Sequence, residues 1–241
     1  MGISYVGIWQ NDNKPAVELC NVDTIDEHFS RFTRGSVREI GREINRTVAE
    51  ATRPGTRQSK PEDQFTIHIY ARSEGCAGII VADQNYDKLV AHQLLSKILD
   101  EFTSKFPKSS WSNKAGLQAY QNGQTEGHLG WYIKEFQDPN NGDSIMKIQR
   151  ELNETKETLQ KAIQSTLERG EKLDNLVAKS DNLSASSKMF YTQAKKQNSC
   201  CVVMSICAAS GWVKQRIIAT QEIIENLSAL SHVNGDVFAF D

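Results

Sequence analysis

Long apolar runs are missing from this 241-residue chain. The longest, Cys200 to Ala209, has about half the roughly 20 residues that a membrane-spanning helix needs. The first residues, MGISYVGIW, have neither the basic start nor the apolar stretch of a signal peptide. Val6 stands where a myristoylation motif has Ser or Thr. We therefore expect any attachment to a membrane to come from lipid or from partners.

Cysteine is scarce, and its arrangement excludes two kinds of site. The cysteines are Cys20, Cys76, Cys200, Cys201 and Cys207. Their odd number argues against a disulfide framework, and no Cys-x-x-Cys pair is present for zinc. The five histidines are scattered and have no metal-ligand spacing. A reducing, cytosolic setting fits such a chain.

An excess of one charge is also missing. Lys and Arg number 28 against 30 Asp and Glu, a formal net charge of −2, which predicts no nucleic-acid partner. The glycines at 116–130 lack the Lys-Ser/Thr of a phosphate loop. We expect His68 to be a surface or hydrogen-bonded histidine on the polar face of a strand. The sequence predicts no enzyme, no metal and no cofactor.

The first 137 residues have the pattern of a small domain that mixes strands and helices. Period-two alternation predicts the strands, and apolar residues at steps of three and four predict the helices. The expected elements are strands at 3–9 and 16–20, a helix at 29–51, strands at 65–71 and 75–83, and a helix at 89–106. Residues 111–137 stay unassigned because their glycines weaken a helix. The order describes a sheet with helices packed on it, an α+β fold.

The apolar face of the first helix has two possible roles. Val37, Ile40 and Ile44 are either part of the domain's core or a surface for another part of the chain.

Residues 138–198 have a heptad pattern in place of the mixed strand and helix pattern of the first 137 residues. After the turn-rich stretch 138–143, steps of three and four hold one seam over more than seven heptads, which predicts a coiled coil. The seam is Ile145, Ile148, Leu152, Thr155, Leu159, Ala162, Thr166, Arg169, Leu173, Leu176, Ser180, Leu183, Ser187, Phe190, Ala194 and Gln197. Its many small residues fit a bundle of several helices. Alone, the segment should be disordered or folded back on something else.

One charged residue, Arg169, interrupts the middle of the seam. Burying an unpaired guanidinium costs several kcal/mol, so Arg169 should meet carbonyl oxygens from neighbouring helices. The alternative is that a lone polar residue only fixes the register of the helices.

A prenylation box stands inside the chain. Cys201-Val202-Val203-Met204 has the form of a farnesylation signal, which is read only at a free C-terminus. The sequence continues to Asp241, with apolar residues at helical spacing in 205–241. We expect the 241-residue chain to lack farnesyl and to be mainly cytosolic.

These parts together resemble a known family. Residues 165–176, STLERGEKLDNL, resemble the centre of R-SNARE motifs, and residues 1–137 look like a longin domain, a profilin-like fold with an antiparallel sheet. The stretch CCVVM at 200–204 is similar to the anchor of Ykt-type longin R-SNAREs, members of the synaptobrevin-like family that use lipid in place of a transmembrane helix. The resemblance divides the chain into a longin domain (1–137), an R-SNARE segment (138–198), a lipidation motif (199–204) and an atypical extension (205–241).

Membrane fusion is the function that this resemblance implies. The R-SNARE segment would form one long helix of a parallel four-helix bundle with three Q-SNARE helices, and Arg169 would meet three glutamines at the central layer. The bundle would drive vesicle fusion between the ER and Golgi, within the Golgi, or at endosomes and vacuoles. In this family the longin domain folds back on the SNARE segment. Rival interpretations are an S-acyltransferase, for which no Cys-His-Asp arrangement is present, and a generic coiled-coil tether.

Lipids would supply the membrane anchor. In a chain ending at Met204, the resemblance implies farnesyl on Cys201 and palmitoyl on Cys200. The implied locations are the cytosol and, once lipidated, the cytoplasmic face of Golgi and vesicle membranes.

Overall fold

The computed structural model describes residues 2–62, 65–137, 156–164, 177 and 180–197. The chain divides into two units, residues 1–208 and 209–241. All described residues belong to the first unit.

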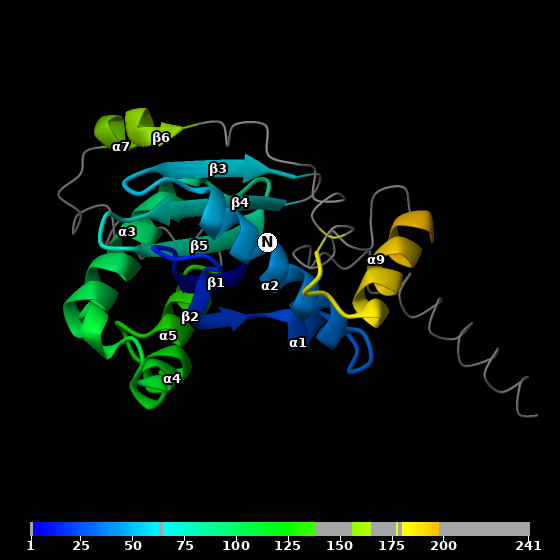
Figure 1. Cartoon of the computed structure of the whole chain (residues 1–241). Coiled ribbons are helices and arrows are strands. Elements are labelled where there is room, and N and C mark those ends of the chain that lie inside the picture. The colour runs from blue at the N-terminus through cyan, green and yellow to red at the C-terminus, as the bar shows by residue number, and fades with distance from the viewer. Residues whose placement is uncertain (1, 63–64, 138–155, 165–176, 178–179, 198–241) are drawn as a thin grey trace, which may run out of the picture. The chain divides into compact units, whose positions relative to one another are not determined.

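A six-stranded sheet forms the centre of this unit (Figure 1). The first five strands in chain order pair antiparallel, and the sixth pairs parallel with β3. In spatial order the strands are β2 (Val17–Asp23), β1 (Ile3–Gln10), β5 (Cys76–Asp83), β4 (Phe65–Ala71), β3 (Arg57–Pro61) and β6 (Ile163–Gln164).

Helices cover both faces of the sheet. On one face, α3 (Lys88–Lys105), α4 (Lys114–Asn122) and α5 (Leu129–Glu135) share an apolar core with β1 and β5. On the other face, α2 (Arg34–Ala51) packs on β4 and β5. Alternation in β5 explains the two cores: Ile80 and Ala82 face α3, whereas Ile79 and Val81 face α2. Two short helices, α1 (Ile25–His28) and the 3₁₀ helix Lys108–Ser110, connect these elements.

Close packing of α3 on β5 depends on Gly78. A Cβ atom at this position would lie 2.9 Å from Leu95 Cδ2, so any other residue would force the leucine side chains of α3 to shift. Asp87 begins α3 by accepting a hydrogen bond from the backbone N–H of Leu89 at 2.7 Å.

The structure confirms the predicted hairpin and strands and corrects three details. The helix expected from Phe29 begins only at Arg34, because Ser30 starts a turn by accepting hydrogen bonds from the N–H groups of Thr33 and Arg34. Strand β3 was not predicted, since its sequence, RQSKP, has no apolar alternation. His68 does not lie on a polar face: it is 1% exposed, because α3 covers that side of β4.

In the single chain, the described heptad residues do not form one long helix. They form α7 (Lys156–Ala162), the two-residue strand β6, and α9 (Ala185–Gln197). Helix α7 packs on α3, β6 extends the sheet at β3, and α9 packs on α2. Most of the seam residues whose side chains the structure describes are buried against the domain instead of against partner helices. This agrees with the expectation that the segment folds back.

Candidate functional site

Two glutamates on α2 hold the heptad segment by accepting hydrogen bonds from its serines. Ser187 Oγ donates to Glu39 Oε2 at 2.5 Å, and Ser184 Oγ donates to the same oxygen at 2.8 Å. The backbone N–H of Ser184 donates to Glu39 Oε1 at 2.6 Å. One turn further along α2, Ser180 Oγ donates to Glu43 Oε1 at 2.8 Å. Both carboxylates thus face hydroxyl donors from residues about 140 positions away in sequence.

These hydrogen bonds stabilise the charged form of both glutamates. Burial alone raises the pKa of Glu39, but the hydrogen bonds from Ser187 and Ser184 outweigh it and hold the pKa below its ordinary value. Burial likewise raises the pKa of Glu43, and hydrogen bonds from Arg46 and Ser180 lower it further than burial raises it. Each glutamate is therefore a charged acceptor, and hydrogen bonds to charged groups are among the stronger ones.

Apolar residues of the heptad segment complete the contact. Val177, Leu183 and Tyr191 join the same core cluster as Ile40 and Ile44 of α2. The two roles considered for the apolar face of this helix are therefore not exclusive. Ile40 and Ile44 belong to the core below the sheet, and the heptad segment adds its own side chains to that core.

The contact covers the seam itself. Of the seven seam residues whose side chains the structure describes, Phe190 is half-buried, Ala162 is exposed and five are buried. The buried ones are Leu159 (1% exposed), Ser180 (8%), Leu183 (6%), Ser187 (0%) and Ala194 (4%). Several residues between them, including Asp181, Met189 and Gln193, are exposed. The same face of the segment cannot pack on other helices while it lies on the domain.

The edge strand β3 receives a second part of the segment. Ile163 and Gln164 pair parallel with Arg57 and Gln58. This pairing occupies N–H and C=O groups that an edge strand otherwise exposes.

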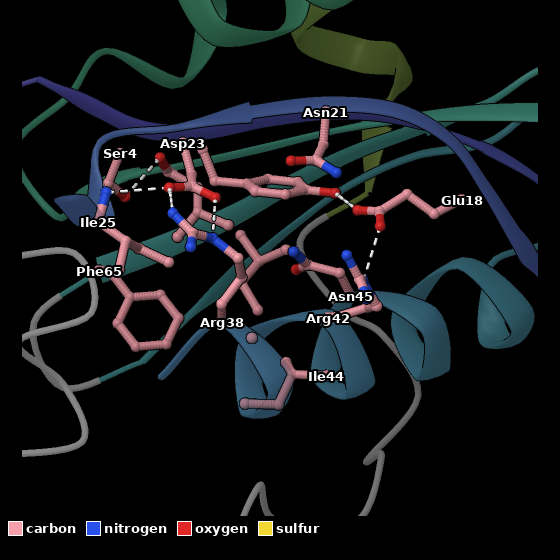
Figure 2. A pocket seen from close by; sticks show the side chains of 14 residues that line it. Ser4, Glu18, Asn21, Asp23, Ile25, Arg38, Arg42, Ile44, Asn45 and Phe65 are labelled. Carbon is pink, nitrogen blue, oxygen red and sulfur yellow. Dashed lines mark hydrogen bonds and ion pairs between the residues drawn. The ribbon is translucent and has the colours of Figure 1, made fainter. Parts of the chain in front are cut away.

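A narrow cavity lies between α2 and the sheet (Figure 2). Its volume is about 40 Å³, which is room for only a few water molecules. Ion pairs close its rim: Arg38 Nε lies 2.9 Å from Asp23 Oδ2, and Arg42 Nε lies 2.8 Å from Glu18 Oε2. Tyr5 also donates its hydroxyl to Glu18 at 2.8 Å. As it stands, the cavity has no space for a lipid chain.

A buried histidine pair joins β3, β4 and α3. Ser59 Oγ lies 2.9 Å from both His68 Nδ1 and His92 Nε2. Burial lowers the pKa of His68 to about 4, although Asp87 opposes the shift. Burial also lowers the pKa of His92 well below its ordinary value, and His68, Arg57 and Lys88 add to this. Both rings are therefore neutral at physiological pH and serve to hold the fold together.

The predicted site residues Arg169, Cys200 and Cys201 lie outside the described residues. Among the residues that the structure does describe, no group of His, Cys, Asp and Glu has the arrangement of a metal site. Within the same residues, no helix combines the length and apolar character needed to cross a membrane. Cys20 and Cys76 are buried free thiols in the domain core.

Comparison with known proteins identifies both halves of the chain. The longin family, a regulated-SNARE-like domain, matches residues 25–126, and the synaptobrevin family matches residues 144–226. The synaptobrevin homolog ykt6 of Schizosaccharomyces pombe is 44% identical over 203 residues, and YKT6 of Saccharomyces cerevisiae is 45% identical over 204. These alignments cover 84% and 85% of this chain and 100% of each relative. The chain belongs to the Ykt6 family of synaptobrevin homologues. The VAMP-like protein YKT61 of Arabidopsis thaliana is 44% identical over 188 residues, which are 78% of this chain and 91% of that protein.

Membership of the Ykt6 family confirms the predicted R-SNARE role. The longin match lies at residues 25–126, and the synaptobrevin match, which implies SNARE partners, lies at residues 144–226. Because the relatives are SNARE proteins, which are not enzymes, the S-acyltransferase interpretation is set aside. A generic coiled-coil tether is set aside because the relatives are synaptobrevin homologues.

The sequence pattern does not identify the contact residues on α2. Glu39 and Glu43 are one helical turn apart and so lie on the same side of the helix. Ser180 and Ser187 were recognised only as small seam residues. The available signal was one of spacing. Ser180 and Ser187 are seven residues apart on the seam, and Glu39 and Glu43 are four residues apart on α2.

Proposed function

We propose that this R-SNARE drives vesicle fusion by forming a four-helix bundle with three Q-SNARE helices, and that its longin domain restrains it by holding the same seam. In the bundle, Arg169 is the central-layer residue and meets three glutamines. Helix formation and burial of the seam against the partners supply the free energy that brings two membranes together. The transport steps it serves are those between the ER and Golgi, within the Golgi, and toward endosomes or vacuoles.

The observation that carries the proposal is the burial of the seam on the longin domain. Leu159, Leu183 and Ser187 are almost completely buried by intramolecular contacts, yet the heptad pattern requires these positions in the centre of a bundle. The two states therefore compete for one set of side chains. A ligand shifts such an equilibrium only by its differential affinity for the two states, so Q-SNARE helices must replace the contacts that the longin domain provides.

Lipids provide the membrane anchor in the proposed cycle. A chain ending at Met204 carries farnesyl on Cys201 and a reversible palmitate on Cys200. One lipid chain gives marginal, reversible binding, whereas two give stable anchoring. The closed chain, in which the R-SNARE segment lies on the longin domain, is then cytosolic. The open chain, which carries both lipids, is bound to the cytoplasmic face of Golgi and vesicle membranes.

The test is assembly of the full chain with three Q-SNARE helices. An SDS-resistant complex should form, and Glu39→Ala should speed its formation by weakening the closed state. Glu27, an exposed residue of α1, supplies the control variant Glu27→Ala. A complex that does not form, or forms at one rate in all three chains, contradicts the proposal.

A further inference from the structure

The sheet of the longin domain has two edges, and they differ in what covers them. At the β3 edge, Ile163 and Gln164 of β6 pair with the strand. At the other edge lies β2, which pairs with β1 alone among the described strands (Figure 1). An edge strand presents a row of backbone N–H and C=O groups to which a further strand can add. The edge of β2 is therefore open to a strand from another molecule.

The backbone groups of β2 face inward and outward in turn. Thr24 donates its N–H to a backbone carbonyl oxygen of β1 at an N–O distance of 3.0 Å. Because direction alternates along an antiparallel strand, Val22 also faces β1, whereas Asn21 and Asp23 face outward. The N–H of Asn21 accordingly donates to the side-chain Oε1 of Gln121 at 3.3 Å. A glutamine of α4 thus stands where the carbonyl group of a neighbouring strand would lie.

An open groove of about 730 Å³ follows this edge. Helix α2 contributes Arg38 and Arg42 to the lining from one face of the sheet. Helix α5 contributes Ile133 and Lys134 from the other face, and residues 21–24 lie between the two helices. The groove therefore occupies the position of the next strand. A strand fills about 160 Å³ per residue, from a rise of about 3.3 Å, a spacing of about 4.8 Å and a thickness of about 10 Å, so about four residues fit.

The lining matches a peptide backbone better than a charged ligand. Three of its side chains are acidic and three are basic, and Arg38 pairs with both Asp23 and Asp26. Side-chain amides, each with donors and an acceptor as in a peptide unit, make up a third of the lining: Asn21, Gln121, Asn122, Gln124 and Gln137. We infer that the β2 edge binds an extended, mostly uncharged peptide segment of another protein as a seventh strand of the sheet.

The two sides of such a peptide meet different surfaces. Successive side chains of a strand point to opposite faces of a sheet. Those on the α5 side meet Gly130 and Ile133, which favour small apolar residues, and those on the α2 side meet the ion pair of Arg38 and Asp23. Backbone hydrogen bonds supply the affinity and this alternation supplies the specificity. Binding here needs neither the heptad segment nor Q-SNARE helices, so the inference stands independently of the proposed function.

The probe is a library of random peptides of about twelve residues, displayed on phage and selected on the full chain. Amide hydrogen exchange, measured residue by residue by NMR, then locates the selected peptide. Exchange of the Asn21 and Asp23 amides should slow by about tenfold or more. The Val22 amide, already bonded to β1, should change less. A selection without a binder, or protection confined to other elements, overturns the inference. Protection of Asn21 that rises with the concentration of the chain alone identifies a second copy as the occupant and also contradicts it.

Two substitutions at one position test the backbone contact. Asn21→Pro removes the outward N–H, a change that an edge strand tolerates on its open side, whereas Asn21→Ala keeps this N–H. The proline variant should bind the selected peptide at least about tenfold more weakly than the alanine variant. Unchanged exchange in β5 shows that both variants are folded. Equal affinities for the two variants contradict the inference.

Methylation of the selected peptide gives a second test, which cannot disturb the fold of the protein. One peptide carries N-methyl groups on its odd-numbered amides and the other on its even-numbered amides. Only every second amide of an added strand faces β2, so one of the two peptides should bind at least about tenfold more weakly than the other. Equal binding of both peptides shows that they do not add to the sheet and overturns the inference.

Discussion

Ser187 donates its hydroxyl hydrogen to Glu39 at an Oγ–Oε2 distance of 2.5 Å, across 148 positions of the sequence. The serine is fully buried and belongs to the seam of the R-SNARE segment, whereas the glutamate belongs to the longin domain. A hydroxyl on the seam thus donates its hydrogen bond to the domain when the chain is closed. This hydrogen bond joins the R-SNARE segment directly to the longin domain.

Removing the Glu39 carboxylate should release helix α9. Glu39→Ala deletes the acceptor of three hydrogen bonds, and hydrogen bonds to charged groups contribute about 1.5–3 kcal/mol each. Tryptic cleavage at Lys188 tracks the open population and should become at least about tenfold faster, since about 1.4 kcal/mol corresponds to a factor of ten. Glu27→Ala is the control, and a cleavage rate equal to that control contradicts the closed contact.

Arg169 should govern the register of the bundle rather than its formation. Arg169→Leu should still allow the helices to pair but should impair reconstituted fusion and turnover of the complex. Arg169→Gln should be tolerated only when a partner's central glutamine becomes arginine. Unchanged fusion and turnover with Arg169→Leu would show that the layer assignment is wrong.

Farnesyl should depend on where the chain ends. In a chain ending at Met204, Cys201→Ser should abolish membrane association, while Cys200→Ser should leave a weakly bound or soluble farnesylated pool. In a recombinant chain that is made to end at Asp241, Cys201 would lie forty residues from the C-terminus, and the enzyme that reads a C-terminal box should add no farnesyl to it. Intact mass and membrane fractionation of both chains check this, and farnesyl on the longer, untrimmed chain would contradict it.

The buried histidine pair should make the longin domain sensitive to mild acid. The pKa of His68 falls from 6.5 to about 4 on folding, so the unfolded chain binds more protons between these values and stability is lost as pH falls. Between pH 7 and 5.5 the loss from His68 should be about 1 kcal/mol, and His92, whose pKa burial also lowers, should add to it. Urea unfolding at both pH values measures the loss, and His68→Gln should reduce the difference. A pH-independent midpoint contradicts the assignment.

Sequence alone predicted most of the longin fold because its core obeys simple periodicity. The alternation of Phe65, Ile67 and Ile69 and the apolar stripe of Leu94, Ile98 and Phe102 each identified an element that the structure confirms. Strand β3 could not be predicted because its sequence is polar and contacts with its neighbours hold it in place. Arg57, for example, stacks 3.8 Å above the centre of the Tyr70 ring. Helices α4 and α5 could not be predicted because glycines weaken the helical pattern of their sequences.

The seam could also be predicted, but not what covers it in the single chain. A heptad pattern predicts which residues are buried in a helical interface, but it does not predict which partner buries them. Ser180 and Ser187 could be assigned to the seam, whereas their acceptors, Glu43 and Glu39, lie on a helix whose relation to them depends on the tertiary fold. Two histidines 24 positions apart in sequence meet at Ser59 for the same reason.

In the proposed mechanism, one face of the R-SNARE segment packs either on the longin domain or in the bundle. A spin label at Phe32, beside the start of α2, and another at Met189, on the exposed side of α9, measure this directly in a chain whose Cys200, Cys201 and Cys207 are serine. We expect one short, narrow distribution of distances between the two labels for the chain alone. Addition of three Q-SNARE helices should replace it with a longer, broader one as the SDS-resistant complex forms. A short distance that persists in the assembled complex would contradict the account.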